Sequence, residues 1–424
     1  MISASAFVSL PQQELHHAQL LSCYLIFIAS YTVFAFGKFP GFRIDRAGMA
    51  VIGAALMIAV GALPPSQALS FIDFSTIVLL FSMMVIVSNL RLAGFFDWTT
   101  SAVVRGLRPR HFLPLVIFTS GILSAFFVND IICLVMAPFV LAVTQRLRMQ
   151  PVPHLLALAT ASNIGSSATI TGNPQNMIVG SYSHIPYVDF MAHLGPVALA
   201  GLFADWAVLH WMYFRKRDRE AEIAATAESQ LRAPRPYPGL RKSLLVMALV
   251  LIGFLAGYPP ALVAALGAAL MLITRVVDPR EVYKGIDWGL LVFFTGLFLI
   301  VGGAQKAGIV ASILELLQHF NLQNTVAFSA AVALLSNIVS NVPAVMLLKS
   351  LVPGLANPHL GWLALAMAST LAGNLTITGS VANLIVAESA REAAPITFRE
   401  YFRIGLPITL VTLALGIGWL LLVG

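Results

Sequence analysis

The chain has 424 residues, of which 58% are hydrophobic and 10% are charged, with a mean hydropathy of +0.87 and a formal net charge of +7. Soluble domains carry about 25% charged residues, so the composition excludes a soluble protein and indicates one that crosses a membrane many times. The positive residues lie between the apolar runs and form no basic stripe with aromatic residues. The net charge therefore does not indicate a nucleic-acid partner.

The first part of the chain consists of a polar tail and a series of apolar segments. The tail, residues 1–19, lacks the charged and apolar regions of a cleavable signal peptide. Residues 20–214 follow as a first half that we expect to contain five membrane crossings and one hairpin that enters the membrane and returns. The predicted segments are spans at 20–37, 47–63 and 74–93, the hairpin at 112–147, a broken helix at 155–181 and a last span at 193–214.

A second half follows after the only long hydrophilic segment. Residues 215–242 carry eight Lys and Arg residues and become Pro-rich, which is typical of a linker. Residues 243–424 then repeat the order of the first half, with a hairpin at 324–356 and a broken helix at 361–390. The remaining predicted spans are 243–257, 260–277, 288–304 and 404–423.

An internal repeat relates the two halves. Residues 156–180 (LALATASNIGSSATITGNPQNMIVG) align without gaps with 363–387 (LALAMASTLAGNLTITGSVANLIVA), and 13 of the 25 positions are identical at an offset of 207. GAALM recurs at an offset of 214, and the hairpin residues Asn129 and Asn341 align at an offset of 212. Five crossings are an odd number, so the two halves are expected to lie in the membrane in opposite orientations. The sequence thus predicts an all-α polytopic membrane protein with two inverted-topology repeats.

The distribution of positive charge predicts the topology. If the linker is cytoplasmic, 23 of the 25 Lys and Arg residues lie in or beside cytoplasmic loops, and only Lys306 and Lys349 do not. Such a bias is the usual determinant of orientation. We therefore expect a multi-pass protein of the cell's inner (plasma) membrane, in contact with lipid, with a cytoplasmic linker and both termini outside the cytoplasm.

The two broken helices are the strongest functional signal. The centre of each is rich in Asn, Gly, Ser and Thr, which interrupts the helix and leaves backbone groups without intrahelical partners. Lipid cannot satisfy these groups. Matching breaks in two halves indicate a transporter's substrate site, although an ordinary loop between short helices is the alternative. The predicted solute-binding residues of the breaks are Asn163, Thr169, Thr171, Asn173, Asn176, Asn374, Thr376, Thr378 and Asn383.

The hairpins supply further candidates. Asn129 and Asn341, at the two tips, offer amide donors and acceptors for a solute, or cap a short helix. Asp130 and Asp205 are carboxylates at membrane depth without counterparts in the other half, which indicates proton or Na⁺ coupling, with a structural cap or a bond to a neighbouring helix as the alternatives. Ser124 and Ser340 complete the predicted coupling residues.

Signals of catalysis are lacking. The sequence contains no phosphate loop, no HExxH and no GxSxG motif, and its two cysteines, Cys23 and Cys133, have no metal-ligand spacing. We therefore expect neither an enzyme nor a bound cofactor or metal, only a coupling ion, H⁺ or Na⁺.

Four stretches resemble the ArsB/NhaD permeases of the ion transporter superfamily: SAFFVNDIICLVMAPF, ASNIGSSATITGNPQNMIVG, LLSNIVSNVPAVML and AGNLTITGSVANLIVAESA. The resemblance covers nearly the whole chain after residue 20. It implies a secondary transporter, with Asn129, Asp130, Asn341 and the two breaks as its site. Family members export arsenite or antimonite in exchange for protons, some with a soluble ATPase partner, and homodimers are in keeping with the family.

Taken with the residues, the resemblance favours arsenite or antimonite efflux by proton antiport. The Asn129-Asp130 tip is similar to the arsenite branch, whereas TGNPQN is more similar to general anion permeases. The alternatives are a Na⁺- or H⁺-coupled symporter of carboxylates or inorganic anions, a Na⁺/H⁺ antiporter, and a passive channel. In each case the partner is a small inorganic or organic solute.

Overall fold

A computed structural model describes residues 12–37, 44–96, 98–99, 109–213, 239–273, 277–318 and 321–424. Most of the residues in these ranges are helical, and none of these ranges contains a strand. Most of the predicted linker, the first residues of the predicted tail and several of the cations that carry the predicted topology, such as Arg105 and Arg275, lie outside the described residues.

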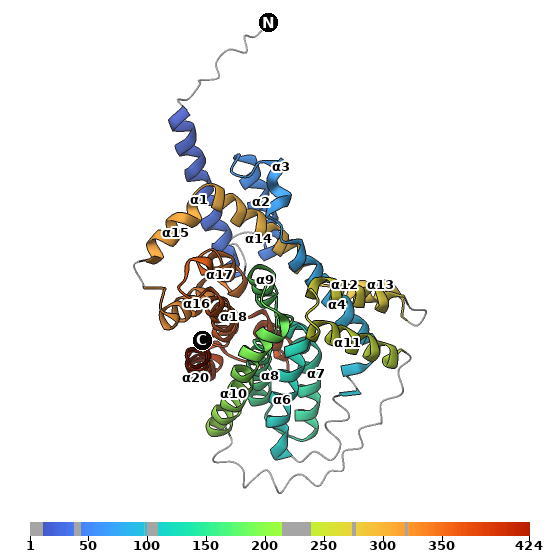
Figure 1. Cartoon of the computed structure of the whole chain (residues 1–424). Coiled ribbons are helices and arrows are strands. Elements are labelled where there is room, and N and C mark those ends of the chain that lie inside the picture. The colour runs from blue at the N-terminus through green and yellow to red at the C-terminus, as the bar shows by residue number, and fades with distance from the viewer. Residues whose placement is uncertain are drawn as a thin grey trace. The chain divides into compact units, whose positions relative to one another are not determined.

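The helices follow the predicted order (Figure 1). In the first half they are α1 (Gln12–Phe36), α2 (Arg46–Ala59), α3 (Pro65–Ala68), η1 (Leu69–Phe71), α4 (Phe74–Leu92), η2 (Pro109–His111), α6 (Phe112–Phe126), α7 (Asn129–Arg146), α8 (Pro151–Ser166), α9 (Pro174–Ser183) and α10 (Tyr187–Tyr213). The second half contains α11 (Leu240–Leu255), α12 (Pro260–Leu272), α13 (Pro279–Lys284), α14 (Trp288–Lys306), α15 (Ile309–Gln318), α16 (Thr325–Val339), α17 (Asn341–Leu348), η4 (Val352–Gly354), α18 (Pro358–Ala372), η5 (Ile377–Gly379), α19 (Val381–Ala390) and α20 (Phe398–Val423).

The structure differs from the prediction at the start of one span and by one additional helix. The span predicted at 193–214 begins six residues earlier, because α10 continues past its apolar part through Asp189. Hydropathy marks only the part of a helix that faces lipid, so it misses a polar first turn. The helix α15 was not predicted, because its 10 residues form too short an apolar run to indicate a membrane crossing.

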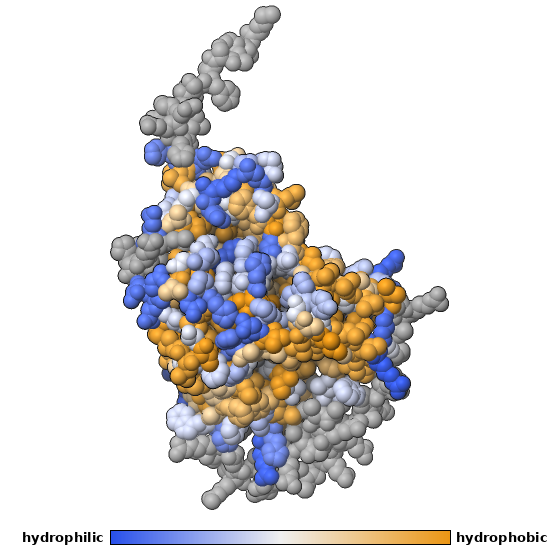
Figure 2. All heavy atoms as spheres, viewed as in Figure 1, coloured by the Kyte–Doolittle hydropathy of each residue, from blue (hydrophilic) through white to orange (hydrophobic). Residues whose placement is uncertain are grey.

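Six described helices are long and apolar enough to cross a membrane: part of α1 (His17–Phe36), α4, α7, α10, α14 and α20. Their surfaces carry large hydrophobic side chains, such as Leu199, Phe203 and Leu410, each more than half exposed. Hydrophobic residues cover much of the face in Figure 2. A soluble protein would bury such side chains, whereas lipid accommodates them, so the chain is an integral membrane protein.

The helices form two compact units, and each unit contains elements of both sequence halves. In the smaller unit, which comprises residues 1–73 and 288–319, α2 packs against α14, and Gly53 receives the side chain of Ile300. In the larger unit α12 packs against α4, and Gly267 lies against Ile86. Both pairs are related by the offset of 214. The same contact is therefore made twice, each time between helices from different halves.

The larger unit contains both hairpins and both broken helices. In it α6, α7 and α10 pack around α8 (Figure 1). The backbones of α6 and α8 approach so closely that a side-chain carbon added at Gly165 would lie 2.0 Å from the carbonyl oxygen of Gly121. Close backbone packing through small residues is the usual way for helices to associate in lipid.

The last helices of the two halves, α10 and α20, also pack together. Gly201 lies opposite Thr412, and Val197 lies opposite Gly416, so residue numbers rise along one helix as they fall along the other. The two helices are therefore antiparallel. This is the relation expected of equivalent elements in inverted repeats.

Candidate functional site

The first break separates α8 from α9, and all of residues 164–174 are buried. Asn173 caps α9, because its Oδ1 accepts the backbone N–H of Asn176 (2.9 Å), and Pro174 occupies the first helical position. The Asn176 amide donates to the carbonyls of Ser166 (3.1 Å) and Thr169 (2.9 Å). Side chains of the break thus satisfy the backbone groups that the interruption frees, as burial requires.

The second break is built in the same way between α18 and α19. Asn383, the equivalent of Asn176, donates to the carbonyls of Gly373 (2.7 Å) and Thr376 (2.9 Å). The two breaks differ in exposure. Leu375, Thr376 and Ile377 are half-buried and Thr378 is exposed, whereas the whole first break is covered.

Asn163, in the last turn of α8, joins the two breaks. Its Nδ2 donates to Oδ1 of Asn374 (2.8 Å) and of Asn383 (2.9 Å), both in the other half. Its Oδ1 accepts from Asn129 Nδ2 (3.0 Å) and Ser380 Oγ (2.9 Å). All five residues are buried. We call this group the Asn163 cluster; it connects the first hairpin tip to both breaks.

A matching set of contacts surrounds Thr370, which occupies the position equivalent to Asn163 at the offset of 207. The Thr370 hydroxyl accepts from Asn173 Nδ2 (3.2 Å) and Gln175 Nε2 (3.2 Å), and lies 3.3 Å from Asn176 Oδ1. Asn163 of α8 therefore contacts α19 in the other half, and Thr370 of α18 contacts α9. The two breaks form one continuous polar region.

The hairpin tips are hydrogen-bonded to the breaks. The backbone N–H of Asn129 donates to the carbonyl of Gly172 (3.0 Å), and its side-chain Oδ1 has no hydrogen-bond partner among the described residues. With its amide nitrogen turned toward them, Asn341 donates to the carbonyls of Ser369 (3.0 Å) and Gly379 (3.3 Å). Asn129 therefore belongs to the Asn163 cluster, whereas Asn341 contacts the backbone of the second break.

The four predicted coupling residues lie in different settings. Asp130 is half-buried in the first turn of α7. Ser124 Oγ donates to Ser162 Oγ (3.1 Å), and Ser340 links α16 to α17 with a left-handed φ of 77°. Asp205 is fully buried and accepts from Thr160 Oγ1 (2.8 Å) on α8, so it makes the bond to a neighbouring helix that was the alternative, while its coupling role stays a prediction.

Four predicted threonines point away from the Asn163 cluster. Thr169 donates to the carbonyl of Ala125 in the first hairpin, and Thr171 Oγ1 lies 2.9 Å from the Tyr187 hydroxyl. Thr376 and Thr378 bond to each other (3.4 Å). The hydrogen bonds of these four side chains therefore fix the first break to α6 and α10 and link two residues within the second break, without contact to the Asn163 cluster. Sequence reasoning missed Thr370 and Tyr187, although the repeat alignment places Thr370 opposite Asn163.

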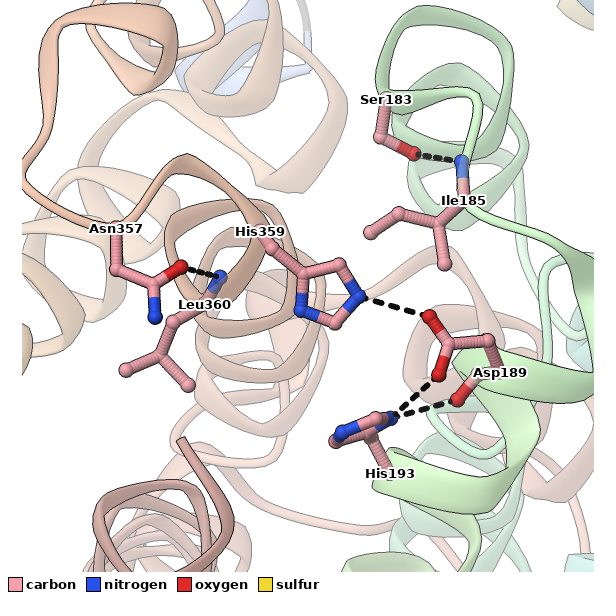
Figure 3. Close-up of polar contacts among 7 residues, drawn as sticks. All are labelled: Ser183, Ile185, Asp189, His193, Asn357, His359 and Leu360. Carbon is pink, nitrogen blue, oxygen red and sulfur yellow. Dashed lines mark hydrogen bonds and ion pairs between the residues drawn. The ribbon is translucent and has the colours of Figure 1, made fainter.

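A second polar cluster joins the two halves at the beginnings of α10 and α18 (Figure 3). His359 Nε2 lies 2.8 Å from Asp189 Oδ2, and His193 Nδ1 lies 3.1 Å from Asp189 Oδ1. Their side chains are between one quarter and one half exposed. This cluster was not predicted, because Asp189 and His359 lie 170 residues apart in sequence and outside the aligned stretches 156–180 and 363–387.

The Asn163 cluster consists of amides and a hydroxyl, so it presents donors and acceptors but no charge. The described residues also contain no group of three His, Cys, Asp or Glu side chains that could hold a metal ion. Such a site suits a small polar solute that exchanges hydrogen bonds with the protein.

Comparisons with known proteins agree with this picture. The model of the CitMHS family, described as citrate transporter, matches residues 31–372. The chain is 33% identical over 416 residues to an uncharacterized transporter of Mycobacterium tuberculosis, covering 92% of this chain and 95% of that protein. It is 32% identical over 455 residues to the silicon efflux transporter LSI3 of Oryza sativa subsp. japonica, covering 90% and 93%.

The fold also matches a solved structure. The YdaH transporter of Alcanivorax borkumensis superposes with a TM-score of 0.52 at 15% identity, and the match covers 96% of this chain and 97% of the other. The family model and the relatives confirm the predicted resemblance to the ion transporter superfamily, and the solved structure shows the same fold. Together with the buried polar breaks, the family match shows that this chain is a transporter and belongs to the CitMHS citrate transporter family.

Proposed function

We propose that the protein exports a small, neutral, hydroxylated solute in exchange for protons, with arsenite and antimonite as its substrates. The observation that carries the proposal is the Asn163 cluster, in which residues of both breaks and the first hairpin tip meet around one buried amide. In water arsenite is a neutral trihydroxide. Its hydroxyl groups match the donors and acceptors of amide and hydroxyl side chains.

The charge of the site favours a neutral solute over citrate. A carboxylate solute carries negative charge, and burying it without a cation is costly. The Asn163 cluster supplies no cationic side chain. The silicon efflux transporter is a relative over most of its length, and silicic acid too is a neutral hydroxide, which supports the same solute class.

Proton exchange is assigned to carboxylates at membrane depth. Asp130 is half-buried one residue after Asn129, so it lies beside the Asn163 cluster and can exchange protons with water when the site opens. We propose that the two halves alternate access to the cluster as inverted repeats. The antiparallel packing of α10 and α20 and the exchanged contacts of Asn163 and Thr370 support this arrangement.

A carboxylate symporter is the second candidate, and one specific observation favours it. Four helices, α7, α9, α17 and α19, begin at the hairpin tips and breaks. Helix N-termini attract anions through their free N–H groups and the helix dipole. In this case Na⁺ would balance the charge of the solute.

Everted membrane vesicles distinguish the two functions. The proposal predicts that arsenite or silicic acid accumulates when the vesicle interior is acidified, and that an added Na⁺ gradient has no effect. Citrate uptake that depends on Na⁺, without uptake of the neutral hydroxides, would instead establish the symporter. Vesicles that contain Asn163→Ala protein provide the control for leakage.

A further inference from the structure

Asp205 is the most deeply buried carboxylate of the described chain, and nothing in the packing of α10 requires its charge. It has no exposed surface, and its Oδ1 accepts from Thr160 Oγ1 (2.8 Å). Its Oδ2 has no hydrogen-bond partner among the described residues, and no described Lys, Arg or His forms an ion pair with it. Burying a charged carboxylate in this setting costs free energy. Oδ2, which has no partner among the described residues, is free to hold the proton that neutralises the group.

The surroundings of Asp205 contain further polar groups without partners. The antiparallel register of α10 and α20 places Asp205 opposite Ile408, next to Thr409, whose buried hydroxyl has no partner among the described residues. The buried Tyr401 hydroxyl also has none, and its side chain lies near both Asp205 and Cys133. The titratable group near Asp205 is therefore Tyr401 from α20, which also lies near Cys133 of α7. Cys133 in turn lies near Asp130.

Hydrogen bonds connect Asp205 to the Asn163 cluster. Thr160 donates its hydroxyl to Asp205, and its backbone carbonyl accepts from Asn374 Nδ2 (3.3 Å). Asn374 Oδ1 in turn accepts from Asn163 Nδ2 (2.8 Å). A change in the charge of Asp205 therefore acts first on Thr160. Thr160 is connected to the Asn163 side chain by two hydrogen bonds, through Asn374.

The second half shows how this position packs without a carboxylate. Thr160 and Asp205 correspond to Met367 and Gly416, at offsets of 207 and 211. Met367 fills the space above Gly416 so closely that an added side-chain carbon would lie 2.1 Å from its sulfur. The same two helices of the other repeat thus replace a buried polar pair with an apolar contact. The fold does not need the pair, and this points to a role in function.

We propose that Asp205 is an internal proton-binding site that couples proton binding to the solute site through Thr160 and Asn374. A proton from the aqueous phase forms an O–H bond at Asp205 Oδ2 and makes the carboxyl neutral. Its release to the opposite side restores the carboxylate, with the nearby Tyr401 hydroxyl available as a donor. The inference rests on the proposed proton antiport for its role, while proton binding itself is independent of the solute.

Infrared spectroscopy of the purified full-length protein in liposomes tests proton binding directly. A protonated buried carboxyl gives a C=O band that shifts in D₂O. We expect this band in the wild type, its loss in Asp205→Asn and its retention in Asp130→Asn. A band that persists in Asp205→Asn, or a wild type without a titrating band, would overturn the proposal.

A double variant separates coupling from folding. Thr160→Met/Asp205→Gly copies the pair found at Met367 and Gly416, so it should keep the thermal stability of the wild type. We expect it to lose both the infrared band and the stimulation of arsenite uptake by a pH gradient. Stimulation that survives in the double variant and in Asp205→Asn would refute the coupling role. A wild type that has the band but shows no pH-driven uptake would refute the antiport and leave the proton site standing.

Discussion

Replacing Asn163 by Ala is the perturbation whose cost follows most directly from the structure. The side chain makes four hydrogen bonds, to Asn129, Asn374, Asn383 and Ser380, and the exposed fraction of Asn163 is only 1%. Interhelical hydrogen bonds in membrane proteins contribute roughly 0.6 to 2 kcal/mol each. Asn163→Ala should therefore lower the free energy of unfolding by about 2 to 8 kcal/mol, because its four partners stay buried.

The unfolding of the purified protein in detergent measures this loss, and the matched control is Thr144→Val. Thr144 is equally buried, but its hydroxyl bonds only to carbonyls of its own helix, those of Val140 (2.8 Å) and Leu141 (2.9 Å). We expect the control to change the unfolding free energy by less than about 1 kcal/mol. If Asn163→Ala destabilises the protein no more than Thr144→Val, the Asn163 cluster does not hold the two breaks together.

Three further predictions concern other parts of the larger unit. Gly165→Val should prevent stable folding, because its side chain would collide with the Gly121 backbone. Gly418→Val should fold, because a side-chain carbon added there meets no atom of a neighbouring segment within 4 Å; the yield of monodisperse protein after purification compares the two variants. Thr171→Val and Tyr187→Phe should be non-additive in unfolding free energy by about 1 kcal/mol, because each removes the same 2.9 Å hydrogen bond, while the exposed Thr378→Val should change little. Fully additive effects would show that this bond is absent. In a double-mutant cycle, Asp189→Asn and His359→Ala should couple by no more than about 1 kcal/mol, because both side chains are more than one third exposed; a much larger coupling would mean that the contact is shielded from solvent.

Much of the fold was predictable because lipid allows few arrangements. Apolar runs located the helices, and the repeat located both breaks and both hairpins, since a helix in lipid can be interrupted only where protein satisfies its backbone. The residues at the centre were also predictable: Asn163, Asn374 and Asn383 were identified from their polarity and place in the breaks, and they are in hydrogen-bond contact.

The side-chain directions were not predictable. Thr169 and Thr171 belong to the same polar run as Asn173, yet they bond to Ala125 and Tyr187. Which way a residue in a non-helical turn points depends on its backbone angles and neighbours, and no periodicity specifies these. The pairing of α2 with α14 and of α4 with α12 was likewise hidden, because sequence order favours packing within each half.

The most direct test of the central claim is pH-gradient-driven uptake of arsenite into everted vesicles by variants from opposite halves. The claim is that Asn163 and Asn383 belong to one solute site. Asn163→Ala and Asn383→Ala should each abolish the uptake, while Thr144→Val protein, inserted in equal amount, should transport like the wild type. Uptake that persists in either asparagine variant, or that is absent from the wild type while Na⁺-dependent citrate uptake is present, would contradict the account.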